Sequence, residues 1–475
     1  MYDESEDDRP CDSLDVERKA LAVATQLARA ALAGDLKQSQ LRERMRRVLG
    51  QAWPWIGPLI RQIRLDYGDS IGAAQHDELV RSILEFAPLR GAFESADEVP
   101  RVRGWYPFQP PMGEPPAGLR VKAKELPRLA TPGDLADWLG LPIGELDWFA
   151  ASLRSDLTAD GPLCHYRYRW LAKRRGGYRL IEIPKPRLRG LQRRVLHRIL
   201  EHVPAHDAAH GCVSGRSTIS AALPHSGKNL VLQIDLQDFF TGVTAGRVHA
   251  MFRTLGYPPA AARTLTGLVT HSTPYSVLRA SPSPELGQND DVGTKSRRHA
   301  MLRIAHLPQG APSSPALANL CAYRLDLRLS GAAAACGIGY TRYVDDLIFS
   351  GDDAFARKIE RVKSMLYSII VDEGFEPHYR KTRAQRQATS QRIVGMVVNQ
   401  KPNVSRREFY TLKAILHNCR RHGPQGQNHL CHPHFRQHLL GRISRVAQLN
   451  ANRGERLPRE FRQIDWSPAE LPKAG

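Results

Sequence analysis

Three aspartates at the ends of apolar segments constrain the fold more than any other feature of this sequence. Residues 229–235 (NLVLQID) form an apolar run of strand length that ends at Asp235. Residues 340–350 (YTRYVDDLIFS) predict two short strands joined in a tight hairpin, with Asp345 and Asp346 at its tip. Adjacent carboxylates repel each other unless a cation lies between them. Three carboxylates from neighbouring strands suit two Mg²⁺ ions, about 4 Å apart, in phosphoryl transfer.

The charge balance favours a polyanionic partner. The 475 residues include 68 Lys and Arg against 48 Asp and Glu, a net charge of +20. Nucleic acid is such a partner, because each neutralised phosphate releases counterions, although a basic solvated surface is the alternative. Prolines interrupt the uncharged stretch 304–323, so we expect no membrane span. The acidic start of the chain and its seven scattered cysteines predict a cytoplasmic location with reduced thiols.

Composition predicts four regions. Apolar residues at helical spacing indicate a helical N-terminal domain over residues 1–95, and prolines mark a linker over 96–125. Residues 126–400 contain the acidic motifs, and residues 401–475 form a basic C-terminal region. Within the third region, residues 272–303 are rich in Ser, Pro and Gly, which predicts an insertion loop.

A second hairpin is predicted upstream of the acids. Tyr166, Tyr168 and Trp170 alternate with Arg167 and Arg169, and a further strand follows over residues 178–183. This pattern fits either an ordinary half-buried hairpin or one whose basic face grips nucleic acid.

Three sequence blocks, in order, resemble the palm of reverse transcriptases. They are Asp235 with Phe240, residues 307–315 (LPQGAPSSP), and residues 343–346 (YVDD). The resemblance implies an α+β right-hand polymerase with fingers, palm and thumb, preceded here by the helical N-terminal domain. It also implies an RNA-directed DNA polymerase that copies an RNA template into DNA from dNTPs, with two Mg²⁺ ions for which Mn²⁺ can substitute.

The resemblance also assigns residues to roles. It makes Asp235, Asp345 and Asp346 the catalytic metal ligands, and Arg179 the clamp on the triphosphate. Phe240 matches the ring that lies under the sugar and rejects a 2′-hydroxyl. Gln309 and Gly310 match residues beside the incoming base pair. Lys381 matches a lysine proposed as general acid for pyrophosphate, and an ordinary surface lysine is the alternative.

From about residue 131 to residue 419 the chain looks most like the retron-type bacterial group. Residues 210–217 (HGCVSGRS) are similar to its block before the palm, which would place Arg216 and Ser217 at the template backbone. Tyr343 is a further expected contact to nucleic acid. Ser405 and Glu408 form a capping box that opens a thumb-like helix. The basic residues of that helix available for phosphate contact are Arg406, Arg407 and Lys413. The group's setting is antiphage defence, with a structured RNA template, a dedicated noncoding RNA and an effector protein.

Two positions depart from the retron pattern. Ala221 stands where an Asn is usual, and Val394 stands where a Thr is usual in Val-Thr-Gly. Because both positions are tied to recognition of the noncoding RNA, a group II intron-like or other defence reverse transcriptase without such an RNA remains an alternative. A catalytically idle RNA-binding protein is a third hypothesis, which the three intact aspartates disfavour.

Cysteine and histidine residues cluster near the C-terminus. Their spacing matches no regular zinc motif and basic residues lie among them, so a surface facing nucleic acid is favoured over a zinc site. The cluster consists of Cys419, His422, His429, Cys431, His432, His434 and His438.

Overall fold

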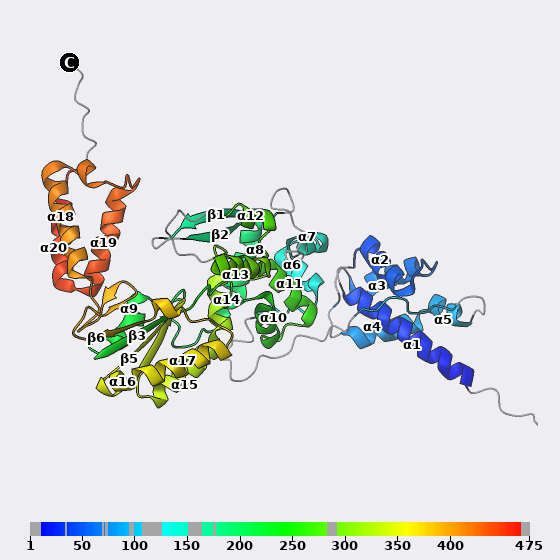
Figure 1. Ribbon diagram of the computed structural model, residues 1–475. Helices are drawn as coiled ribbons and strands as arrows, with labels where there is room; N and C mark the ends of the chain where they lie inside the picture. The colour runs from blue at the N-terminus through cyan, green and yellow to red at the C-terminus, as the bar shows by residue number, and fades with distance from the viewer. Residues whose placement is uncertain are drawn as a thin grey trace, which may run out of the picture. The chain divides into compact units, whose positions relative to one another are not determined.

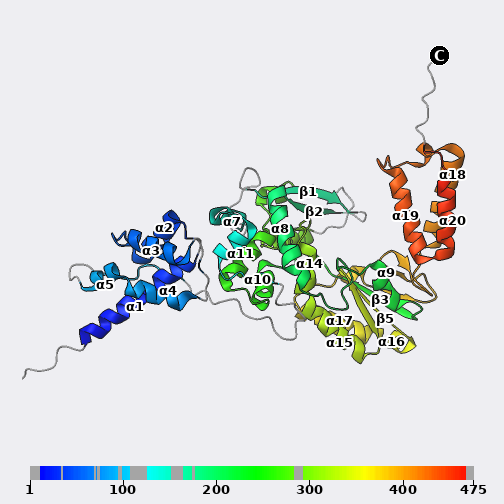
Figure 2. The same ribbon diagram turned by 180° about the vertical axis from the view of Figure 1, so that it is seen from behind.

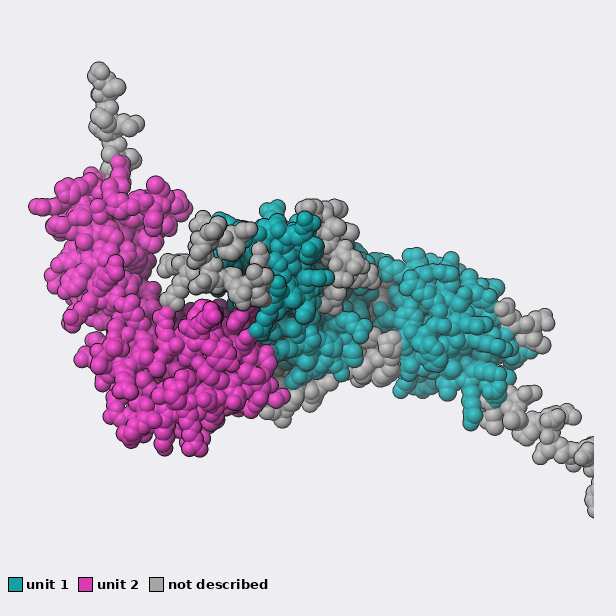
Figure 3. Space-filling model, in the orientation of Figure 1, with its two compact units in different colours: residues 1–204, 240–321 teal, residues 205–239, 322–475 magenta. Residues whose placement is uncertain are grey.

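A computed structural model describes residues 11–33, 36–68, 71, 75–94, 99–106, 126–150, 164–173, 177–282 and 292–466. The chain forms two compact units, one of residues 1–204 and 240–321 and the other of residues 205–239 and 322–475 (Figure 3). The chain leaves the first unit after residue 204 and returns at residue 240, so the predicted region 126–400 contributes to both units.

The N-terminal part of the first unit is helical, as predicted for residues 1–95. Its helices lie together in Figure 1. Their apolar faces enclose a core that includes Leu27, Leu41, Ile60 and Ile83. The helices are α1 (Cys11–Leu32), α2 (Gln38–Leu49), α3 (Ile56–Tyr67), α4 (His76–Glu85) and α5 (Ala87–Glu94).

Residues 99–106 pack on this helical bundle, although composition assigned them to the linker 96–125. The backbone N–H groups of Arg103 and Gly104 donate to the Val48 carbonyl oxygen. A Cβ atom at Gly104 would lie 2.3 Å from the Arg47 carbonyl oxygen, so glycine is required for this close approach. Most of the remaining predicted linker, residues 107–125, lies outside the described residues.

The rest of the first unit combines helices with one hairpin. The N-terminal helix of this group begins after Thr131, whose hydroxyl caps it by accepting from the Asp134 N–H. The predicted hairpin is confirmed: β1 pairs antiparallel with β2 from Tyr166 opposite Pro184 to Ala172 opposite Tyr178. The elements are α6 (Pro132–Leu139), α7 (Ile143–Ala150), β1 (Tyr166–Ala172), β2 (Tyr178–Pro184), α8 (Pro186–Arg198), η4 (Leu200–His202), α10 (Ala245–Thr254), α11 (Pro259–Val269), α12 (Tyr275–Arg279), α13 (Val292–Arg303) and α14 (Ser314–Cys321).

The prediction that residues 272–303 form an insertion loop is wrong in part, because α12 and α13 lie within this range. Val277, Leu278 and Leu302 are buried with Leu180 of the hairpin, so packing stabilises these helices despite a polar composition. Residues 283–291 lie outside the described residues.

The second unit is built around a four-stranded antiparallel sheet in the order β4-β5-β3-β6. Its strands confirm the two acid-bearing segments predicted from the sequence. The strands are β3 (Leu230–Asp235), β4 (Gly339–Tyr343), β5 (Asp346–Gly351) and β6 (Arg383–Arg386). The helices around this sheet are α9 (Thr218–Ala222), η5 (Leu223–His225), α15 (Tyr323–Ala335), α16 (Asp353–Arg357), α17 (Ile359–Asp372) and η6 (Tyr379–Lys381).

A short hairpin and three helices complete the second unit. The Ser405 hydroxyl accepts from the Glu408 N–H, which confirms the predicted cap. The three α-helices, α18 to α20, lie side by side in both views (Figure 1, Figure 2). They share a core that includes Leu412, Leu439 and Phe461. The elements are β7 (Arg392–Ile393), β8 (Met396–Val397), α18 (Arg406–His422), η7 (Gln425–Gln427), α19 (Phe435–Leu449) and α20 (Ala451–Arg462). Among the described residues, every helix is too short or too polar to cross a bilayer.

Candidate active site

Strand register brings the predicted acids together. Asp235, the last residue of β3, lies directly opposite Asp346, the first residue of β5. The backbone N–H of Leu236 donates to the Asp345 carbonyl oxygen, 2.8 Å away, which ties the end of β3 to the hairpin tip. Burial and the negative charges of Asp345 and Asp235 raise the pKa of Asp346 to about 7. The three carboxylates thus form a concentration of negative charge that a cation would stabilise.

Lys381 belongs to this same group of side chains. Its Nζ lies 3.1 Å from both carboxylate oxygens of Asp235. The side chain extends from η6, which precedes β6 at the sheet edge, and about half of its surface is exposed. The structure therefore brings Lys381 to Asp235, and its role as general acid stays a prediction.

The hairpin tip has a strained backbone. Val344 has a φ of +58°, which is unfavourable for a β-branched residue. Arg342 is fully buried on β4, and its guanidinium donates to the Val344 carbonyl oxygen at 3.0 Å. The same guanidinium forms a bidentate ion pair with the fully buried Asp326 of α15, at 2.8 and 2.6 Å. This ion pair fixes the turn that presents Asp345 and Asp346.

Sequence reasoning missed this Arg342–Asp326 pair. The available signal was Arg342, a charged residue inside a predicted strand next to the acid pair. Its partner Asp326 lies on a different element, the helix α15 before that strand.

The chain segment before α9 supports the hairpin from the other side. The Arg342 N–H donates to the Ala208 carbonyl, and the His210 N–H donates to the Arg342 carbonyl, both at 2.7 Å. A Cβ atom at Gly211 would lie 2.5 Å from Cγ2 of Val344, so this position has room only for glycine. The block 210–217 therefore shapes the hairpin tip through its backbone.

His225 links the two strands of the hairpin. Its Nδ1 lies 2.7 Å from the Ser350 hydroxyl and its Nε2 lies 2.8 Å from the Thr341 hydroxyl. Burial lowers the pKa of His225 to about 3, so the ring is neutral at physiological pH.

Arg216 and Ser217 make contacts within their own chain. The Arg216 guanidinium donates to the carbonyl oxygens of His206, Asp207 and Ala209 and to the Asp207 carboxylate. Ser217 caps α9 by accepting from the Ser220 N–H. These contacts hold both residues in place within the chain, and the template contact expected from the sequence stays a prediction.

The remaining nucleic-acid candidates of the second unit lie on two elements. Tyr343 is the last residue of β4 and pairs with Asp346. Arg406 and Arg407 are exposed in the first turn of α18, while Lys413 is half-buried in the next turns.

The first unit contains the candidate nucleotide-binding residues Arg179, Phe240, Gln309 and Gly310. Arg179 is exposed near the start of β2, and Phe240 is half-buried. The Gln309 carbonyl accepts from the N–H of Glu182 on β2 at 3.0 Å. A Cβ atom at Gly310 would lie 2.7 Å from the Glu182 carbonyl oxygen, and its φ of +141° also favours glycine. The turn thus lies directly against the hairpin strand that carries Arg179.

Ligand chemistry at the aspartates fits a hard divalent cation, because carboxylate oxygens are the donors that Mg²⁺ prefers. Within the described ranges, His, Cys, Asp and Glu side chains form no group of three already arranged around one point. This holds for the C-terminal Cys/His cluster, where His432 instead packs on His438. It holds also for the aspartates, where the Lys381 ammonium contacts Asp235.

Comparison with known proteins identifies the family. Residues 171–398 match a protein-family model whose description is reverse transcriptase (RNA-dependent DNA polymerase). The chain is 37% identical to the retron Mx65 reverse transcriptase of Myxococcus xanthus over 341 residues, which cover 70% of this chain and 72% of the relative. It is 32% identical to retron Mx162 reverse transcriptase of Myxococcus xanthus, covering 75% and 71%. It is also 32% identical to retron Ec86 reverse transcriptase of Escherichia coli, covering 53% and 70%.

These matches confirm the family resemblance and the α+β right-hand polymerase fold predicted from the three sequence blocks. The matched region includes both strands that bring Asp235 and Asp346 together. The chain therefore belongs to the retron reverse transcriptases and is an RNA-directed DNA polymerase.

Proposed function

We propose that this polymerase uses Asp235, Asp345 and Asp346 to hold two Mg²⁺ ions, for which Mn²⁺ can substitute. The observation that supports this most is the cross-strand pair of Asp235 and Asp346, whose mutual repulsion contributes to the raised pKa of Asp346. Bound Mg²⁺ supplies activation of the primer 3′-oxygen and charge stabilisation of the leaving pyrophosphate. Lys381, already within hydrogen-bond distance of Asp235, is positioned to donate a proton near these groups.

The residues of the first unit bind the incoming dNTP in this proposal. Arg179 contacts the triphosphate, and Gln309 with Gly310 lies beside the new base pair. Phe240 lies under the sugar and excludes a 2′-hydroxyl. The support for Arg179, Gln309 and Gly310 is that the turn at Gln309 hydrogen-bonds to the strand that carries Arg179, whereas the role of Phe240 rests on its sequence motif.

We further propose that the template is a structured RNA that contacts Tyr343 and the basic residues Arg406, Arg407 and Lys413. Two of these, Arg406 and Arg407, are exposed in one turn of α18. From the resemblance of its sequence motifs to the retron-type group, we propose that this RNA is a dedicated noncoding RNA and that the enzyme acts with an effector protein in antiphage defence.

A reverse transcriptase that uses another RNA is the second candidate. Ala221 and Val394 replace the Asn and Thr tied to noncoding-RNA recognition in retrons. Val394 lies at the β7–β8 turn with a φ of +45°, followed by Gly395 at +78°. Sequencing the RNA that copurifies with the enzyme separates the two candidates.

Primer extension on an RNA template tests the catalytic proposal. Wild-type enzyme with Mg²⁺ should extend a primer with dNTPs, and the Asp345→Asn/Asp346→Asn double variant should lose this activity. The matched control is Asp353→Asn, which removes an exposed carboxylate in α16 and should extend normally. Equal extension by the double variant and the wild type would refute the metal-ligand assignment.

The sugar-selection role of Phe240 has a separate test. Replacing the ring with a methyl group opens space for a 2′-hydroxyl, so Phe240→Ala should use ribonucleotides at least about tenfold better relative to dNTPs. Steady-state kinetics with matched dNTP and NTP substrates measure this ratio. A ratio identical to that of the wild type would show that another residue selects the sugar.

A further inference from the structure

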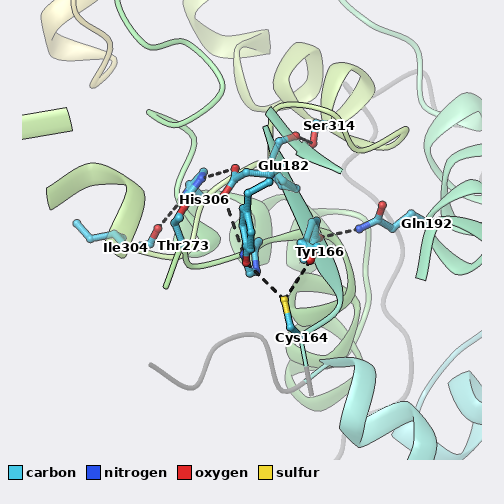
Figure 4. A network of polar contacts seen from close by, with 11 residues as sticks. Cys164, Tyr166, Glu182, Gln192, Thr273, Ile304, His306 and Ser314 are labelled. Carbon is cyan, nitrogen blue, oxygen red and sulfur yellow. Dashed lines mark hydrogen bonds and ion pairs between the residues drawn. The ribbon is translucent and has the colours of Figure 1, made fainter. Parts of the chain in front are cut away.

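A buried polar network in the first unit joins Glu182 of the β1–β2 hairpin to Thr273 and His306 (Figure 4). At its centre is Glu182 of β2, whose side chain is fully buried. Its Oε1 accepts from the Thr273 hydroxyl at 2.7 Å, and its Oε2 lies 3.0 Å from Nε2 of His306. A fully buried carboxylate is costly unless it is paired, so these contacts require a specific explanation.

The pair is ionic. Nδ1 of His306 lies 2.7 Å from the Ile304 carbonyl oxygen while Nε2 faces Glu182, so both ring nitrogens donate and the ring is an imidazolium. Although burial opposes both charges, their mutual attraction raises the pKa of His306 and lowers that of Glu182. The neighbouring His271 is neutral, because burial lowers its pKa to about 4.

The same residues are joined through their backbones. The Glu182 N–H donates to the Gln309 carbonyl at 3.0 Å, three residues after His306. His306 and His271 exchange backbone hydrogen bonds at 2.9 and 3.0 Å. Glu182 therefore holds the chain on both sides of Leu307 and Pro308, with its carboxylate on one side and its backbone on the other.

We propose that Glu182, paired with His306 and Thr273, is a positioning residue that fixes the Gln309–Gly310 turn against the strand carrying Arg179 and so controls binding of the incoming dNTP. This inference rests on the proposed nucleotide-binding role of the turn. Glu182 is buried and acts through these neighbours.

Single-nucleotide incorporation kinetics, normalised to the active fraction, test the proposal. Glu182→Gln keeps the size of the side chain but removes the charge that holds His306. Its KM for dNTP should rise about tenfold while kcat per active site stays within about twofold. The double variant Glu182→Gln/His306→Gln should be no worse than the poorer single variant, because the two residues act as one unit.

Gln192→Met is the matched control. Gln192 is also fully buried, and its amide donates to the Tyr166 hydroxyl and the Leu268 carbonyl, each at 3.0 Å, and not to Glu182, His306 or Thr273. This variant should lower the melting temperature yet keep the wild-type KM for dNTP. If Glu182→Gln loses thermal stability in the same way but keeps the wild-type KM, the residue is merely structural and the proposal is overturned.

Two further variants make every outcome decisive. If Glu182→Gln yields no folded enzyme, the KM of Thr273→Val for dNTP is measured instead. A threefold rise in this KM supports the proposal, and an unchanged KM overturns it.

Gln309→Ala separates the inference from the proposed function on which it rests. If Gln309→Ala leaves KM unchanged, the nucleotide role of the turn fails; if it raises KM while Glu182→Gln does not, only the positioning role fails.

Discussion

At the scale of single residues, the buried Arg342–Asp326 pair supports the turn that carries the half-buried candidate metal ligands Asp345 and Asp346. Asp326→Asn removes the partner of a fully buried guanidinium, which should cost about 3–5 kcal/mol of folding free energy and lower the extension rate because the Val344 turn loses its support. Denaturant unfolding and primer extension measure both effects. The control Glu360→Gln breaks an exposed ion pair with Lys363 and should cost less than about 1 kcal/mol. Equal losses in the two variants would contradict this account.

Burial of His225 predicts how the free energy of unfolding depends on pH. Its folded pKa, about 3, lies below the ordinary value of 6.5, so the unfolded chain binds a proton that the native protein does not. Stability from this residue is complete above pH 6.5 and is lost as pH falls toward 3, at up to about 1.4 kcal/mol per pH unit. Unfolding curves between pH 7 and 4 should show this slope in the difference between wild type and His225→Gln. Parallel curves would mean that His225 is not buried in neutral form.

At the scale of elements, the β4–β5 hairpin depends on the backbone segment that passes beside it. Gly211→Ala places a methyl group within 2.6 Å of the Val344 backbone nitrogen, so the tip must move. We expect primer extension to fall at least about tenfold and stability to fall by about 1–3 kcal/mol.

The control for this substitution is Gly331→Ala in α15. A Cβ atom there meets no atom within 4 Å, and alanine favours helix, so this variant should be as active as the wild type and slightly more stable. Wild-type activity in Gly211→Ala would show that the tip tolerates displacement.

Elements with local sequence signals were predictable, and elements that depend on distant partners were not. The alternating hairpin β1–β2 and the acid-bearing strands have short-range patterns, and the structure confirms them. Helices α12 and α13 were missed because their stability comes from packing of Val277 and Leu302 on the hairpin. The buried partners Asp326 and Glu182 were missed for the same reason, since only tertiary structure reveals what a lone acid in a helix or strand contacts.

At the scale of the whole molecule, the helical bundle of residues 11–106 has its own hydrophobic core, which is made of residues between Val23 and Phe93. A fragment of residues 1–106 should therefore fold by itself, with a helical circular-dichroism spectrum and a cooperative melting transition. A chain starting at residue 107 should keep primer extension on a generic RNA template within about threefold of the wild type. A fragment without a melting transition would show that the bundle requires the rest of the chain.

The antiparallel pairing of β3 with β5 also has a consequence for synthesis on the ribosome. Residues 230–235 emerge long before residues 346–351, their partners in the sheet. All core residues of the N-terminal bundle are synthesised early, so the bundle can fold while translation continues. Strand β3, in contrast, has no strand to pair with until β5 has been synthesised, and its apolar residues stay unburied until then. A nascent chain halted before β5 therefore contains Asp235 but lacks Asp346, its partner across the sheet, so polymerase activity begins only when most of the protein has been made.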